Sequence, residues 1–379
     1  MKRILLWTVM LCIACISAFA LISADNEEVK NDNECYALIE CGTGSIVLSE
    51  NAGKQVNCGY LSKLMTLLLI AEDIETGKYR LDTELTASET VRGTKGAVIW
   101  LEPGDKISVE ELLKGVIIGN ANDAVTVLAE KSEGSIEAFV SRMNSEAFDL
   151  GLRDTAFYSP YGYYDEREHT TAADMAVICR KLAGYEFLRD SFCTWREHIR
   201  NGTVELVSEN TLTRTYSAHI GFKAAHSEQS GYCIAEGAVS EDGTRYIAVV
   251  LCASDEKTCF DRAKELCRRG FREYKVTATL FPDEMVRPVR VKKGVESAVS
   301  VSLASQSGLV IPQSAAQIRT VTVLPQYLTA PVRKGQVIGT AAFYDGRTLV
   351  YESDIVADES VDRLDYGNAI SKMLSNVVK

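Results

Sequence analysis

Residues 61–72 form an apolar helical segment that carries one lysine, Lys63, in its first turn, just after a short Asn/Gly-rich loop. The first turn of a helix has unpaired N–H groups, so developing negative charge is stabilised there. A nucleophile in that turn, with a lysine one turn later on the same face, would form an acyl-transfer site. The residue three positions before Lys63 is Tyr60. What the chain does therefore depends largely on this tyrosine.

Composition limits the class of protein. The chain has 379 residues, of which 46% are hydrophobic and 25% charged. These are ordinary globular values, and the length allows two domains. The formal net charge of −11 gives no electrostatic reason to bind nucleic acid, so we exclude that class of partner.

The N-terminus has the pattern of an export signal. Lys2 and Arg3 precede an apolar run from Ile4 to Ile22, and small residues follow before Asp25. We predict a signal peptide over residues 1–24, a polar linker over 25–34 and an extracytoplasmic, secreted protein associated with the cell wall or membrane. An uncleaved membrane anchor is the alternative, because the run approaches spanning length.

The cysteines do not suggest a disulfide framework or a metal centre. Eleven are present, and two of them lie in the leader. The remaining odd number has no C-x-x-C pair, so we predict no zinc site, no cofactor and mostly buried thiols. A local bridge between Cys35 and Cys41 is possible.

The order of elements predicts an α+β domain over residues 35–275, with a sheet built from distant chain segments. Two short strands, 36–40 and 45–49, form a hairpin, and two longer ones, 232–239 and 246–252, form another. Between the hairpins the apolar spacing predicts helices, with Ser108 and Thr170 as N-caps. The predicted helices cover residues 61–72, 124–130, 135–151, 171–183 and 259–274, and one more begins at Ser108.

The sequence pattern changes from long helical segments to short strands after residue 275. Short strands with turn residues between them predict a small all-β domain over residues 276–357. The predicted strands are 286–291, 297–303, 318–324, 337–344 and 348–352. Residues 358–379 are predicted to carry a short amphipathic helix from Val361. Its mixed charge favours packing on protein at least as much as weak contact with a membrane surface.

Several sequence blocks in this order resemble the penicillin-binding D-alanyl-D-alanine carboxypeptidases, serine enzymes that remove the last D-alanine from peptidoglycan stem peptides. The blocks are the hairpin 36–51, Leu101–Gly104, Gly119–Ala124, His169–Asp174, Ser230–Cys233 and Ala330–Gln336. The resemblance spans nearly the whole mature chain. It implies a β-lactamase/transpeptidase-like domain followed by that family's β-rich C-terminal domain.

The three motifs that carry the family's chemistry are altered. The family's S-x-x-K holds nucleophile and base, S-x-N supplies a proton-relaying hydroxyl and an amide, and K-T-G meets the substrate carboxylate. In this chain the first motif keeps its lysine, Lys63, but has Tyr60 at the nucleophile position. The second keeps its amide, Asn122, but has Asn120 in place of the hydroxyl residue. The third keeps its lysine, Lys223, but has Ala224 and Ala225 in place of the threonine and the glycine.

Each retained or altered residue has two interpretations. Lys63 is either a kept base or a structural lysine that pairs with Asn120 and Asn122. Lys223 either binds an anion in the cleft or is a solvated strand residue. Tyr60 is either a plug or aromatic recognition surface, or it simply fills space.

No other serine restores the S-x-x-K pattern. Ser62 is adjacent to Lys63, and neighbouring helix residues point about 100° apart. Ser254 and Lys257 have the right spacing, but we expect them in a polar turn that precedes no apolar helix.

Two functional hypotheses follow. In the first, the protein is a catalytically inactive homologue that binds a peptidoglycan stem peptide or a cell-wall protein. In the second, it is a working serine-type D-alanyl-D-alanine carboxypeptidase with an unforeseen nucleophile. The losses in all three motifs favour the first.

Overall fold

A six-stranded antiparallel sheet organises the first domain of the computed structural model, which describes residues 34–277, 287–304, 308–315 and 318–365. The strand order is β2-β1-β10-β9-β7, and β8 also pairs with β9. The two ends of the domain therefore meet in the sheet centre, as the α+β prediction requires. The strands are β1 (Cys35–Glu40), β2 (Ile46–Glu50), β7 (His219–Gly221), β8 (Ala224–Ser227), β9 (Gly231–Val239) and β10 (Arg245–Ala253).

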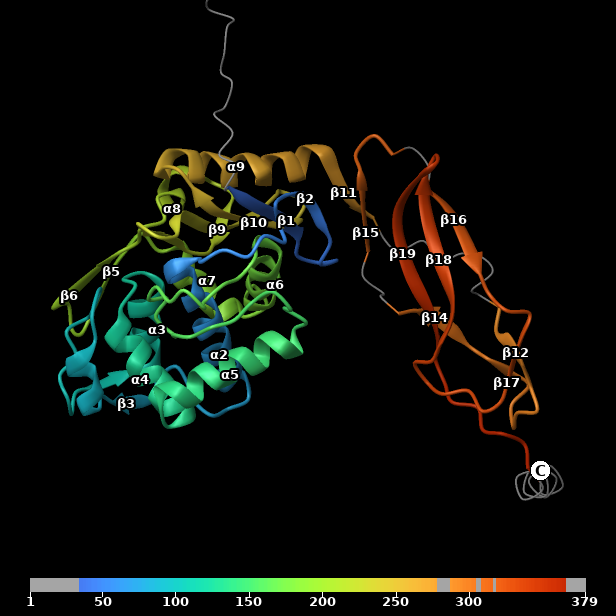
Figure 1. The fold of residues 1–379 in the computed structure, drawn as a ribbon, viewed down its shortest axis with the longest axis horizontal. Helices are drawn as coiled ribbons and strands as arrows, with labels where there is room; N and C mark the ends of the chain where they lie inside the picture. The colour runs from blue at the N-terminus through green and yellow to red at the C-terminus, as the bar shows by residue number, and fades with distance from the viewer. Residues whose placement is uncertain (1–33, 278–286, 305–307, 316–317, 366–379) are drawn as a thin grey trace, which may run out of the picture.

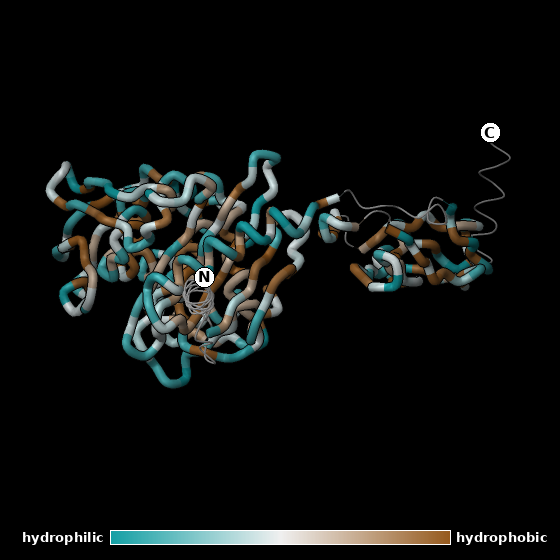
Figure 2. Tube along the Cα trace, turned by 90° about the horizontal axis from the view of Figure 1, so that it is seen from above, coloured by the Kyte–Doolittle hydropathy of each residue, from teal (hydrophilic) through white to brown (hydrophobic). Residues whose placement is uncertain are grey.

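Helices cover both faces of this sheet (Figure 1). On one face lies α9 (Glu256–Glu273), which contacts β9 and β10, and the short α8 (Leu212–Thr215), whose Leu212 shares a buried cluster with Phe260 of α9. On the other face lie α6 (Ala172–Leu182) and the remaining helices. In Figure 2 the brown, hydrophobic segments run through the interior of this domain. The other helices are α2 (Lys63–Glu75), α3 (Val109–Ile117), α4 (Asn122–Glu133), α5 (Ile136–Asp149) and α7 (Arg189–Cys193).

Helix α2 is the centre of the larger hydrophobic cluster. Every residue from Lys63 to Ala71 is buried, so the helix is enclosed on all sides rather than amphipathic. It packs against α6, α4, α3 and α5. A short 3-10 helix, η1 (Gly59–Ser62), leads into it, so the predicted helix from Leu61 is confirmed with a tighter first turn.

Small hairpins and turns complete the domain, and composition gave little sign of them. They are β3 (Glu84–Thr86) with β4 (Lys106–Ser108), β5 (Arg196–Ile199) with β6 (Val204–Val207), and the 3-10 turns η2 (Glu89–Gly93) and η3 (Glu186–Leu188). Ser108 caps α3 as predicted. Thr171, not Thr170, caps α6: its hydroxyl accepts a hydrogen bond from the Asp174 amide.

The predicted bridge between Cys35 and Cys41 is wrong, because no disulfide joins them. Cys35 begins β1 and Cys41 follows its last residue, so an extended strand separates them by about 20 Å. Disulfide geometry requires Cα atoms within about 7 Å.

The second domain is all-β and stands beside the first in Figure 1. Its main sheet has the order β14-β19-β18-β16, and a smaller one has β13-β12-β17. β11 pairs with β15 and leads from α9 into this domain. The strands are β11 (Tyr274–Thr277), β12 (Val289–Lys292), β13 (Ala298–Val299), β14 (Val301–Leu303), β15 (Leu309–Pro312), β16 (Ile318–Val323), β17 (Tyr327–Thr329), β18 (Val337–Asp345) and β19 (Thr348–Ala357).

The predicted C-terminal helix does not begin at Val361. Val361 is buried in the core of the second domain and bridges Val332, while Arg363 bridges Gly294. Residues 366–379 lie outside the described residues, as do the predicted signal peptide and most of the linker. Within the described ranges, no helix is long and apolar enough to cross a membrane.

The enclosure of α2 predicts a large effect of truncating one of its leucines. We expect Leu68→Ala to lower the free energy of unfolding by about 2–5 kcal/mol, because Leu68 is 0% exposed and the cavity cannot fill with water. Phe148→Ala, at a side chain that is 63% exposed, is the control and should change stability by under about 1 kcal/mol. Urea denaturation followed by circular dichroism measures both; equal losses would contradict the packing described here.

Candidate active site

Tyr60 lies in the 3-10 turn that leads into α2. Gly59 before it has φ +54°, and a Cβ there would lie 2.8 Å from the Ser230 hydroxyl. A glycine is therefore required for η1 to pack against β8 and β9. This packing places the half-buried Tyr60 ring 4.5 Å from the Lys63 ammonium nitrogen, measured to the ring centroid.

Lys63 is fully buried, and no carboxylate pairs with it among the described residues. Its Nζ donates a hydrogen bond to the Tyr161 carbonyl oxygen at 2.8 Å. Burial lowers the pKa of Lys63 well below its ordinary value, the nearby Lys223 lowers this pKa further, and Glu209 opposes the shift. The suggested pairing with Asn120 and Asn122 is wrong: the lysine bonds to a backbone carbonyl instead.

The second motif lies between α3 and α4. Asn120 adopts a left-handed conformation with φ +56°, and Asn122 is the first residue of α4. The Asn122 amide donates to the Lys95 carbonyl at 2.7 Å and to the Tyr163 hydroxyl at 3.3 Å. The Oδ1 atoms of both asparagines are buried without a hydrogen-bond partner among the described residues. Neither asparagine contributes a hydroxyl that could relay a proton.

The third motif lies at the start of β8. Lys223 is 3% exposed and donates to the carbonyl oxygens of Val116 and Ile117 at 2.9 and 2.6 Å. Burial lowers its pKa to about 8. It is therefore not the solvated strand residue of one interpretation. Ala224 and Ala225 are both buried, and they belong to the clusters on opposite faces of the sheet.

A loop that the sequence analysis missed joins the first two motifs. The Tyr161 carbonyl accepts from Lys63, the Tyr163 hydroxyl contacts Asn122, and the two tyrosine rings lie tilted by 31° with centroids 4.9 Å apart. Gly162 between them has φ +76°, and a Cβ there would lie 2.3 Å from the Gly59 carbonyl oxygen. The loop thus lies directly on η1. The pattern Tyr-Gly-Tyr-Tyr at residues 161–164 was the available signal.

The two alternative serines do not form a nucleophile–lysine pair. Ser62 is fully buried, its hydroxyl has no partner among the described residues, and it lies against Gly162. Lys257 is exposed and pairs with Asp261 at 2.8 Å. Ser254 and Asp255 lie in the bend between β10 and α9, as expected, and Asp255 caps the mostly polar α9 by accepting from the Thr258 amide.

No group of three or more His, Cys, Asp or Glu side chains in the described ranges could hold a metal ion. The candidate site holds two buried amines, of Lys63 and Lys223, and the uncharged polar side chains of Tyr60, Ser62, Asn120 and Asn122.

Comparison with known proteins decides the family. Residues 22–255 match the D-alanyl-D-alanine carboxypeptidase family, and residues 274–363 match the C-terminal domain of penicillin-binding protein 5. The chain belongs to the D-alanyl-D-alanine carboxypeptidase family. The resemblance inferred from the motifs is confirmed.

Relatives of this family align along the whole chain. The D-alanyl-D-alanine carboxypeptidase DacF of Bacillus subtilis is 28% identical over 388 residues, covering 100% of both chains. DacC of Escherichia coli is 28% identical, over 87% of this chain and 84% of its own. Penicillin-binding protein 5 from Haemophilus influenzae superposes with a TM-score of 0.78 at 24% identity, covering 87% of this chain and 97% of its own. The predicted two-part fold of this family is thereby confirmed.

Glu168 is a buried carboxyl group at the end of the loop over η1. It is 4% exposed; Oε2 accepts from the Tyr158 amide, and Oε1 has no partner among the described residues. Burial raises its pKa to about 7. Because the folded-state pKa is raised, the protonated form favours folding. Stability is full below the unfolded pKa of about 4.3 and falls as the pH rises toward 7.

Glu168→Gln should therefore stabilise the protein at pH 8 relative to wild type, by up to about 3 kcal/mol, and have little effect at pH 4.5. The amide is neutral at both pH values and can still accept from the Tyr158 amide. Thermal denaturation at the two pH values measures the difference, with Glu166→Gln, at an exposed neighbour, as the control. A pH-independent effect would show that Glu168 is ionised in the fold.

Proposed function

We propose that this member of the family does not perform acyl transfer and instead binds a cell-wall peptide, or a protein partner in the cell wall. The observation that carries the proposal is the environment of Lys63. Its amine is enclosed by the Tyr60 ring and the Tyr161 carbonyl, and no serine hydroxyl among the residues that the structure describes is hydrogen-bonded to it. A base without a hydroxyl to deprotonate cannot start acyl transfer.

Tyr60 is a poor substitute for serine on physical grounds. Its phenol has a pKa of about 10, and its oxygen lies several ångströms further from the backbone than a serine hydroxyl. Misplacement of about 1 Å can alone cost about 100-fold in rate. Loss of the nucleophile from an acyl-transfer site costs about 10⁴–10⁶ in kcat.

The other two motifs support the same conclusion. Asn120 cannot relay a proton, and Ala224 cannot hydrogen-bond a substrate carboxylate. Ala225 is 4% exposed, so the methyl group that replaces the family's glycine hydrogen fills space at the strand. The proposal gains support because the three losses are chemically independent and each acts against the same reaction.

The alternative is an active serine-type D-alanyl-D-alanine carboxypeptidase that trims peptidoglycan stem peptides. Two observations favour it: relatives carry that name, and Ser62 places a hydroxyl next to Lys63 in sequence. Against it, Ser62 is 0% exposed and covered by Gly162, so a substrate carbonyl could not reach it without movement of the loop.

We also propose an extracytoplasmic location, since wall-peptide binding requires it and the N-terminal pattern predicts export. Weak contact with a membrane surface through residues 358–379 stays a prediction.

Incubation with a fluorescent penicillin tests the absence of acyl transfer. We expect no covalent adduct on the wild-type protein by gel fluorescence and intact-mass spectrometry, because no serine hydroxyl is hydrogen-bonded to Lys63. An active relative such as DacF of Bacillus subtilis is the positive control. A stoichiometric adduct would overturn the proposal, and its position, mapped by peptide mass spectrometry, would test Ser62 directly.

Restoring the nucleophile alone should not restore the enzyme. We expect Tyr60→Ser to remain at least about 100-fold below a DacF-like rate of D-alanine release, because Asn120 and Ala224 still lack hydroxyls. The triple variant with Asn120→Ser and Ala224→Thr should release D-alanine faster than the single one. Full activity of the single variant would show that the second and third motifs matter less than their chemistry suggests.

A further inference from the structure

A histidine–glutamate pair lies buried in the first domain, outside the three motifs. His219 begins β7 and Glu236 lies in β9, and their side chains are 3% and 0% exposed. The Nδ1 atom of His219 lies 2.8 Å from Oε1 of Glu236, and its Nε2 atom lies 3.3 Å from the carbonyl oxygen of Phe192 in α7. One imidazole ring therefore joins the edge of the sheet to a helix.

The two contacts of His219 need two protons. A backbone carbonyl only accepts, so the contact with Phe192 requires a proton on Nε2. The contact with Glu236 requires a second proton, either on Nδ1 or on the carboxyl group. This count is the same whether the pair is an imidazolium with a carboxylate or an imidazole with a carboxylic acid. Removal of one proton thus leaves two acceptors facing each other at one end of the ring, and that contact is lost.

Asn210 holds the carboxyl group from another side. Its Nδ2 donates to Oε2 of Glu236 at 3.2 Å, and its Oδ1 accepts from the Leu212 amide at the start of α8. An amide side chain does not titrate, so this contact is present at every pH. We therefore expect a change in protonation to act on His219 and its contact with α7, while Glu236 stays in place.

The groups around the pair do not titrate in the same range. Among the described residues, Cys193 of α7, Tyr216 after α8 and Cys267 of α9 lie close enough to Glu236 for its charge to act on them. Burial raises the pKa of all three above ordinary values that already exceed about 8. These groups are thus neutral near pH 7. The charged side chains that act on Cys193 and Tyr216 are Arg189, Asp190, Glu265 and Arg268.

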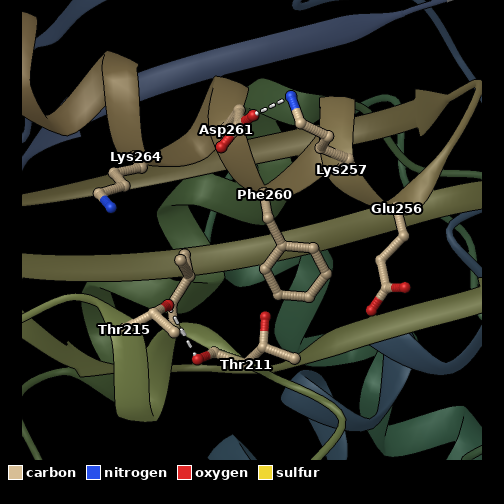
Figure 3. Close-up of a pocket in the computed structure, with 8 residues that line it drawn as sticks. Thr211, Thr215, Glu256, Lys257, Phe260, Asp261 and Lys264 are labelled. Atoms are coloured by element: carbon tan, nitrogen blue, oxygen red, sulfur yellow. Dashed lines mark hydrogen bonds and ion pairs between the residues drawn. The ribbon is translucent and has the colours of Figure 1, made fainter.

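Other charged residues of α9 gather at a separate hollow. Figure 3 shows Glu256, Lys257, Asp261 and Lys264 around this hollow of about 360 Å³ between α8 and α9. Lys257 pairs with Asp261 at 2.8 Å, and the Lys264 nitrogen lies 5.5 Å from the Tyr216 ring centroid. The histidine–glutamate pair does not line this hollow, so it forms a distinct cluster in the interior.

The contact with α7 lies next to the third motif. The Phe192 ring packs edge-on against the Phe222 ring with centroids 5.0 Å apart, and Phe222 precedes Lys223. Lys223 bonds to the carbonyls at the end of α3, and α3 packs against α7. Loss of the contact between His219 and Phe192 would therefore loosen the edge of the sheet that carries Lys223.

The environment favours the state with both protons. Burial lowers the pKa of His219, but the hydrogen bond and charge of Glu236 and the Phe192 carbonyl outweigh it, so this pKa lies above its ordinary value. Burial raises the pKa of Glu236 as well, although His219 and Asn210 oppose that shift. Both contacts are thus complete below about pH 6.5, the ordinary value for histidine, and one is lost as the pH rises through the raised pKa.

We propose that the His219–Glu236 pair is a pH-dependent latch, which fixes α7 and the third-motif edge of the sheet while it holds both protons and releases them when it loses one. The latch goes beyond the proposed function, because it does not depend on whether the protein performs acyl transfer. It adjusts the mobility of β7 and of the adjoining Lys223 to the pH outside the protein.

Histidine NMR tests the protonation of the latch on the whole protein. The chain has four histidines, and the triple variant His169→Gln, His198→Gln and His226→Gln leaves His219 as the remaining one, with the buried pair intact. We expect its ring signals to titrate with a midpoint above that of the same residue in urea-denatured protein, which is about 6.5. A midpoint at or below the denatured value would overturn the proposal.

Hydrogen exchange measured by mass spectrometry tests the release of α7. After correction for the intrinsic effect of pH, we expect peptides that cover α7 and β7 to exchange roughly tenfold faster above the midpoint, because one hydrogen bond is lost. Peptides of α2, which is buried on every side, are the internal control and should keep their corrected rates. Equal corrected rates of α7 and β7 on both sides of the midpoint would refute the latch.

The variant Glu236→Gln separates protonation from packing. The new amide can donate to Nδ1 of a neutral His219 and accept from Asn210, while Nε2 donates to the Phe192 carbonyl. We therefore expect slow exchange in α7 without the dependence on pH. A dependence equal to that of the wild type would show that another group controls α7, and the assignment would be wrong. If this variant does not fold, the exchange of the wild-type protein decides the question by itself.

Discussion

Lys63 donates a hydrogen bond to the Tyr161 carbonyl from the first turn of a helix that is buried on every side. A lysine without a carboxylate partner is stable at such a position only when it is largely uncharged or its donors are satisfied. The carbonyl of Tyr161 and the Tyr60 ring provide this environment. This hydrogen bond connects α2 to the loop over η1, and Gly59 and Gly162 allow the close approach of the surrounding backbone. Lys63 therefore has a structural contact that needs no acyl-transfer chemistry.

The two lysines stabilise the frame of the candidate site through contacts that do not depend on its reaction. Lys223 is held by the carbonyls of Val116 and Ile117 at the end of α3, so it ties the third motif to the helical part of the domain. Lys63 ties α2 to the loop. Both contacts use donors that an active enzyme would also need, and both stabilise the fold without a hydroxyl. Positions 60, 120, 224 and 225 differ from the family's pattern, whereas Lys63, Asn122 and Lys223 match it.

Much of the fold could be predicted from the sequence, for identifiable reasons. The apolar run of α2, the cap at Ser108 and the alternating strands around Ser240–Thr244 are local patterns that determine local structure. The short strands β3 to β7, β11, β15 and β17 were missed because strands of three or four residues carry too little apolar alternation to be distinguished from loops. The helix expected from Val361 was wrong because its apolar residue packs into the β core and pairs with Val332.

The site was predictable in membership but not in contacts. The motif spacing identified the residues from Tyr60 to Ala225, yet no sequence pattern indicated that Lys63 would bond to Tyr161 rather than to an asparagine. Side-chain partners across about 100 residues are set by how the loop at 160–163 meets η1, and that approach requires Gly162.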